Sequence, residues 1–66
     1  MSPKMRQAVG DVGNWISQQW GLDIPAQRYI LRAIRDAGVY PPLTFREIEL
    51  VAQNALFLKN DANRRD

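Results

Sequence analysis

Apolar residues recur at intervals of three and four positions along three stretches of the chain, a spacing that places them on one face of an α-helix. The three stretches predict helices over about residues 3–20, 24–37 and 44–60. Because each helix carries one wide apolar face, the three faces can share a core. The sequence therefore predicts an all-α, compact three-helix domain over residues 1–60, followed by a polar, frayed C-terminal tail over 61–66.

Residues from all three apolar faces form the expected core. The first helix contributes Met5, Ala8, Val9, Val12, Trp15, Ile16 and Trp20. The second helix contributes Ala26, Ile30, Ala33, Ile34 and Ala37. The third helix contributes Phe45, Ile48, Val51, Ala52, Ala55, Leu56 and Leu58. At this spacing the two tryptophans indicate packing rather than a surface for stacking bases.

Two short breaks rich in helix-terminating residues separate the predicted helices. In the first break Gly21 suits a helix end, Asp23 suits the N-cap of the next helix, and Pro25 is tolerated only in a first turn. In the second break Gly38 suits a helix end, and the pair Pro41-Pro42 forces an extended stretch.

Local capping signals mark the starts of the first and third helices. Ser2 suits the N-cap of the first helix, and the stretch from Thr44 to Glu47 matches a capping box at the start of the third. Gly10 and Gly13 lie inside the first helix, where each costs about 1 kcal/mol relative to Ala. These glycines predict a late start or a kink in the first helix.

The composition indicates a domain without catalytic chemistry. A chain of 66 residues with no Cys and no His has no disulfide and none of the usual zinc ligand sets. It also lacks a histidine base and a cysteine nucleophile, and so small a domain has little room for a water-excluding cleft. We therefore expect a protein that is not an enzyme, with no cofactor, no bound metal and no small-molecule substrate.

The charges are distributed unevenly along the chain. Residues 1–35 hold five basic and two acidic side chains, whereas residues 36–66 hold four and five. A polyanion would therefore approach the first half of the chain. No apolar run fits a signal peptide or a membrane span, which predicts a cytoplasmic protein with no membrane partner.

The stretch 13–32, with sequence GNWISQQWGLDIPAQRYILR, resembles a helix-turn-helix of small bacterial and phage DNA-binding regulators. Ser17 is a small residue at the helix contact, Gly21 provides the turn, and Leu22 is one of the apolar residues that lock the two helices together. Pro25 and Gln27 depart from the family's pattern. The resemblance implies that the second helix is the recognition helix.

The resemblance implies that the function is transcriptional regulation and that a dimer binds duplex DNA, because one such motif contacts few base pairs. The residues implied to contact DNA lie on the second helix: Gln27, Arg28, Tyr29, Arg32 and Arg35. Arg can bond guanine with two hydrogen bonds, Gln can do so with adenine, and a row of arginines neutralises phosphate.

A second stretch is similar to the first two helices of winged-helix domains. It comprises residues 30–38, a helix ending in Gly38, and residues 42–48, which open the third helix. No recognition helix follows Leu58, so the similarity supports a helical regulator fold more than it identifies a DNA-contacting helix.

The third helix carries a separate candidate surface for binding a protein. Leu50 and Phe57 lie seven residues apart and point away from the main apolar face, beside Arg46 and Gln53. Two exposed apolar groups in line predict a contact either with a second copy or with another protein. Alternatively, the second break folds back over them. The competing function is thus a protein-binding adaptor or inhibitor that uses this strip and the arginines of the second helix.

Overall fold

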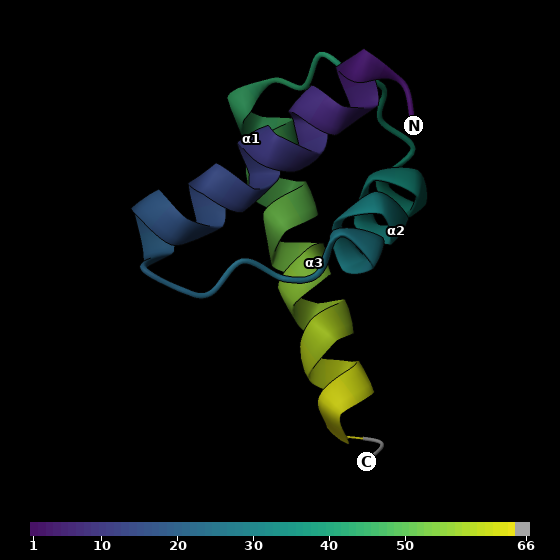
Figure 1. The fold of residues 1–66 in the computed structure, drawn as a ribbon. Coiled ribbons are helices and arrows are strands. Elements are labelled where there is room, and N and C mark those ends of the chain that lie inside the picture. The colour runs from purple at the N-terminus through teal and green to yellow at the C-terminus, as the bar shows by residue number, and fades with distance from the viewer. Residues whose placement is uncertain (65–66) are drawn as a thin grey trace.

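The computed structural model describes residues 1–64 and contains three helices in that range and no strand (Figure 1). They are α1 (Pro3–Trp20), α2 (Gln27–Ala37) and α3 (Phe45–Arg64). Helix α1 crosses the first half of α3, and α2 lies beside both (Figure 1). Helix α2 packs more extensively against α3 than against α1. The predicted all-α three-helix domain is therefore confirmed.

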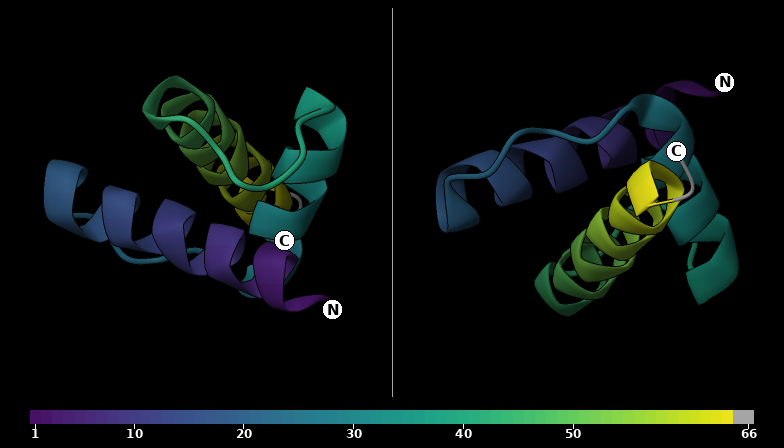
Figure 2. Two further views of the ribbon diagram at one scale, coloured as in Figure 1. Left: turned by 90° about the horizontal axis from the view of Figure 1, so that it is seen from above. Right: turned by 90° about the horizontal axis from the view of Figure 1, so that it is seen from below.

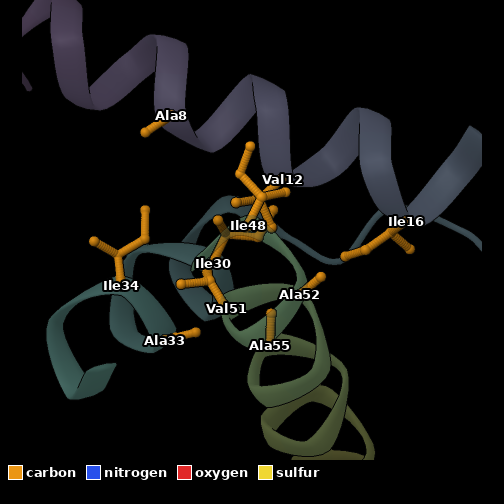
Figure 3. Close-up of a cluster of buried hydrophobic side chains, with 10 residues drawn as sticks. All are labelled: Ala8, Val12, Ile16, Ile30, Ala33, Ile34, Ile48, Val51, Ala52 and Ala55. Carbon is orange, nitrogen blue, oxygen red and sulfur yellow. The ribbon is translucent and has the colours of Figure 1, made fainter. Parts of the chain in front are cut away.

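The core lies where the three helices meet (Figure 3). Its buried apolar residues are Ala8, Val12, Ile16, Ile30, Ala33, Ile34, Ile48, Val51, Ala52 and Ala55. Six further residues expected in the core are only partly buried and pack against its margin: Met5, Val9, Trp15, Trp20, Leu56 and Leu58. Four of the ten buried residues are alanines, which allow the helices to approach closely where larger side chains would hold them apart.

The predicted caps of α1 and α3 are confirmed. The Ser2 hydroxyl accepts a hydrogen bond from the Met5 backbone N–H at 3.2 Å. At the start of α3 the Thr44 N–H donates to the Glu47 carboxylate at 2.8 Å, and the Glu47 N–H donates to the Thr44 hydroxyl at 3.2 Å. These bonds satisfy N–H groups that a helix terminus otherwise leaves without partners.

Both predicted glycine helix ends are also confirmed. Gly21 and Gly38 adopt the left-handed conformation, with φ angles of 63° and 68°. A side chain at either position would meet the steric penalty of that region, so glycine is the residue that ends α1 and α2 at least cost.

The start of α2 differs from the prediction. The helix begins at Gln27 rather than near Ile24, and Ala26, not Asp23, is its N-cap, without a side-chain hydrogen bond. Ile24 precedes Pro25, and a residue before proline is steered away from helical angles. A connection of six residues, 21–26, therefore joins α1 to α2 and runs back along α1 (Figure 2).

The path of this connection along α1 explains why one of the two glycines lies inside that helix. Helix α1 is continuous from Pro3 to Trp20, without the late start that its glycines predicted. Gly13 is buried, and a Cβ atom placed on it would lie 3.0 Å from the γ2 carbon of Ile24. The missing side chain lets the connection pass close to the helix. Gly10, in contrast, faces open space.

Alanine substitutions of these two glycines should therefore separate the effect of helix propensity on the free energy of unfolding from the effect of packing. Gly10→Ala is expected to raise the free energy of unfolding by about 0.5–1 kcal/mol, because alanine favours the helix and meets no neighbour. Gly13→Ala gains the same propensity but pushes against Ile24, so its increment should be smaller or negative. Urea denaturation followed by circular dichroism measures both, and equal increments would show that the contact with Ile24 has no effect.

Three positions at helix ends differ from their expected burial, and α3 runs further than expected. Ala26 and Ala37 are exposed at the ends of α2, and Phe45, in the first turn of α3, is 77% exposed. Each lies at an end of its helix. Residues 61–64, expected in a frayed tail, continue α3; residues 65–66 of that predicted tail lie outside the described range.

Candidate functional site

Three arginines form one exposed side of α2, which we call the basic face: Arg28, Arg32 and Arg35. Their spacing of four and three residues places them in a row, opposite the side that buries Ile30 and Ala33. No acidic residue lies in the first turn of α2. The basic face thus has the position and charge that the sequence predicted.

Local contacts orient two of these arginines. The guanidinium carbon of Arg28 lies 4.6 Å from the centre of the Tyr29 ring, and the same group donates a hydrogen bond to the Tyr29 hydroxyl at 3.1 Å. Arg32 forms an ion pair with Asp36, with 3.8 Å between Nε and Oδ2. Both side chains of that pair are substantially exposed, so solvent screens it and an anionic ligand can compete for Arg32.

The remaining residues predicted on α2 flank the basic face. Gln27 is exposed at the first position of α2, and its amide nitrogen lies 3.5 Å from the sulfur of Met1, to which it donates. Tyr29 is partly buried. With Arg32 it lines a shallow cavity of about 250 Å³ against Leu58 and the last turns of α3. All five predicted DNA-contacting residues therefore lie on α2, but Tyr29 is turned toward α3.

The connection before α2 is longer than the turn implied by the helix-turn-helix resemblance. That motif joins its helices with three or four residues, whereas here six separate α1 from α2. Leu22, expected to lock the two helices together, is 49% exposed. Contacts between α1 and α2 are the sparsest of the three helix pairs. The orientation of α2 is therefore set mainly by α3, and any DNA contact would depend on α2 itself rather than on the turn.

A second candidate surface lies on α3 and comprises Arg46, Leu50, Gln53 and Phe57, which we call the α3 strip. All four residues are exposed; Leu50 is 50% and Phe57 66% accessible. The second break does not cover them, because Leu50 and Phe57 remain open to solvent and Tyr40 of the break is itself 85% exposed. The sequence expectation that these residues form an exposed row is confirmed.

A groove between α1 and the start of α3 was not predicted. Its volume is about 490 Å³, and it is lined by Asp11, Asn14, Trp15, Gln18, Gln19, Leu43, Thr44, Phe45 and Ile48. The rings of Trp15 and Phe45 lie 6.1 Å apart between centres. The Trp15 indole nitrogen is buried without a hydrogen-bond partner. The sequence signal that could have predicted this groove is the position of Phe45 in the first turn of the third helix. A side chain that faces inward there can extend beyond the end of the core.

No helix within residues 1–64 is both long enough and apolar enough to cross a bilayer. Comparisons of the chain with models of protein families, with curated proteins and with solved structures find no match.

Proposed function

We propose that this domain is a small DNA-binding regulator that contacts duplex DNA through the basic face of α2. The observation that carries the proposal is the alignment of Arg28, Arg32 and Arg35 on one exposed side of a helix whose opposite side is anchored in the core. Guanidinium groups held in a row on a rigid helix are suited to phosphate oxygens and to the edge of guanine.

The shape and polarity of α2 favour docking by its first turn. An 11-residue helix is about 16 Å long at about 1.5 Å per residue, and the major groove is about 12 Å wide, enough to admit a helix. The N-cap residue, Ala26, makes no side-chain hydrogen bond to the first N–H groups of α2. The positive end of the helix dipole is therefore not capped by a side chain, and it adds to the positive charge of Arg28. Stacking on Tyr29 restricts the rotamers of Arg28, which lowers the entropy lost on binding.

Position along α2 predicts a different role for the first and last arginines. Arg28→Ala is expected to weaken binding to a preferred DNA sequence by about 1–3 kcal/mol and to reduce sequence preference, as loss of a base contact does. Arg35→Ala should weaken binding to all sequences alike and reduce the salt slope by about one unit, as loss of a phosphate contact does.

The measurement is fluorescence anisotropy with labelled duplexes at two salt concentrations, after selection of a preferred sequence from a random library. Both variants should keep the wild-type circular dichroism spectrum, because both side chains are exposed. Wild-type affinity in both variants would show that the basic face does not contact DNA, and absence of any binding at low salt would remove the DNA proposal.

The second candidate function is a protein-binding adaptor or inhibitor, and it is favoured by the exposure of Leu50 and Phe57 on the α3 strip. Exposed apolar side chains in line on a helix are typical of protein contact surfaces. In this alternative the basic face meets an acidic surface of the partner, so the arginine variants lose the partner while binding no DNA.

A further inference from the structure

One carboxylate borders the basic face of α2. Asp36 lies one helical turn after Arg32, and 3.8 Å separates its Oδ2 from the Nε of that arginine. It is the only acidic residue of α2. A phosphate that binds Arg32 through this group must displace Asp36. We infer that Asp36 is an internal competitor of phosphate and lowers the affinity of the basic face for DNA, an inference that rests on the proposed function.

The position of Asp36 does not stabilise α2. The residue lies in the last turn of the helix, where the negative end of the helix dipole disfavours a carboxylate. The ion pair also has its cation on the N-terminal side, which is the weaker of the two orientations at this spacing. No acidic residue occupies the first turn, where the dipole would favour it. The single carboxylate of α2 therefore lies at the end where it weakens the helix and beside an arginine of the basic face.

The ion pair is open enough for phosphate to compete with it. The side chain of Arg32 is 62% accessible and that of Asp36 is 43% accessible. Exposed pairs of this kind change an equilibrium constant by about 1.4- to 5-fold. A phosphate oxygen must overcome an attraction of that size, and after it binds Arg32 it still lies near the negative charge of Asp36. The expected effect is therefore a lower affinity rather than a block of binding.

The competition acts on the middle arginine of the basic face. The guanidinium of Arg28 contacts an aromatic ring and a hydroxyl group, neither of which neutralises its charge. Asp36 follows Arg35 directly in the chain, yet its ion pair is formed with Arg32. Any effect of Asp36 on DNA binding should therefore depend on the presence of Arg32.

Replacing the carboxylate by an amide of the same shape tests the inference. Asp36→Asn is expected to raise the affinity for nonspecific duplex DNA about 2- to 5-fold at low salt. The gain should be smaller at high salt, because salt screens both the ion pair and the phosphate contact. Fluorescence anisotropy with a labelled duplex measures the affinity. The circular dichroism spectrum should stay that of the wild type, because both side chains of the pair are exposed.

Two controls separate the ion pair from net charge. Asp11→Asn removes the same negative charge from an exposed position on α1, outside the basic face, and should leave the affinity close to that of the wild type. The second control introduces Asp36→Asn into a protein that already carries Arg32→Gln. The gain should vanish in that protein, because the residue for which Asp36 competes is absent.

Unchanged affinity of the Asp36→Asn protein would overturn the inference. An equal gain in the Asp11→Asn protein, or a gain that persists without Arg32, would overturn it as well, since Asp36 would then act only through net charge. All three results leave the proposed function standing. A wild type that binds no DNA at low salt has a different meaning, because it refutes the proposed function and the inference with it.

Discussion

Ile30→Ala is expected to lower the free energy of unfolding by about 2–5 kcal/mol and to leave much of the protein unfolded at 25 °C. Ile30 is 1% exposed and lies on α2 among the buried side chains of α1 and α3 (Figure 3). Removing its outer carbons leaves a cavity that a close-packed core does not readily fill. A single core in a chain of this size supplies only about 3–5 kcal/mol of net stability, so the loss is comparable to the total.

Circular dichroism at increasing urea concentration measures this effect, with Leu22→Ala as the matched control. Leu22 is 49% exposed on the connection between α1 and α2, so the control removes a similar number of carbons from a site that is half solvated. We expect it to cost less than about 1 kcal/mol. A cooperative transition at the wild-type midpoint in the Ile30→Ala protein would show that the three helices do not share the core described above.

Replacing all three arginines of the basic face by glutamine is expected to abolish most DNA binding. Each phosphate contact contributes about 0.9 to the slope of log affinity against log salt. Because Arg28 is assigned a base contact, loss of the two phosphate contacts of Arg32 and Arg35 should flatten the slope by about 1.8. Between about 50 and 200 mM salt, a slope of that size corresponds to a roughly 12-fold change in affinity.

Loss of positive charge could by itself weaken DNA binding, so a control variant loses the same number of positive charges at other sites. Lys4, Arg6 and Lys59 lie on α1 and α3, outside both candidate surfaces, and replacing them by glutamine removes the same three positive charges from the formal net charge of +2. Anisotropy titrations at several salt concentrations should give a near wild-type slope for the control. If both triple variants lose binding equally, DNA responds to overall charge and the basic face is not a specific contact surface.

The sequence predicted local structure well because the relevant interactions are local. Ser2, Gly21, Gly38 and the pair Thr44 and Glu47 each act on backbone groups within a few residues, and all five were placed correctly. The order and faces of the helices followed from the apolar spacing in the same way.

One error is local: Pro25 steers Ile24 away from helical angles, so α2 begins at Gln27 and Asp23 is not its N-cap. The other errors concern features that depend on contacts between distant residues. The return of the connection along α1 depends on Gly13 accommodating Ile24, a contact that neither residue reveals alone. Phe45 has the spacing of a core residue, yet its ring lies beside Trp15 at the open groove between α1 and α3 and is 77% exposed. The groove beside Trp15 was missed for the same reason. The residues of the basic face and of the α3 strip were found because exposure on a helix follows from the position of its core face.

The length of α3 has a consequence for amide hydrogen exchange. Its middle turns carry Val51, Ala52 and Ala55, which are fully buried, whereas residues 59–64 are exposed or only partly buried. Amides in the middle of α3 can exchange only when the whole domain opens, while those near its end exchange through fraying of the last turns. Amides of one helix thus exchange by two routes, global unfolding in its middle and local fraying at its end. Leu50 of the α3 strip lies on the part that opens last.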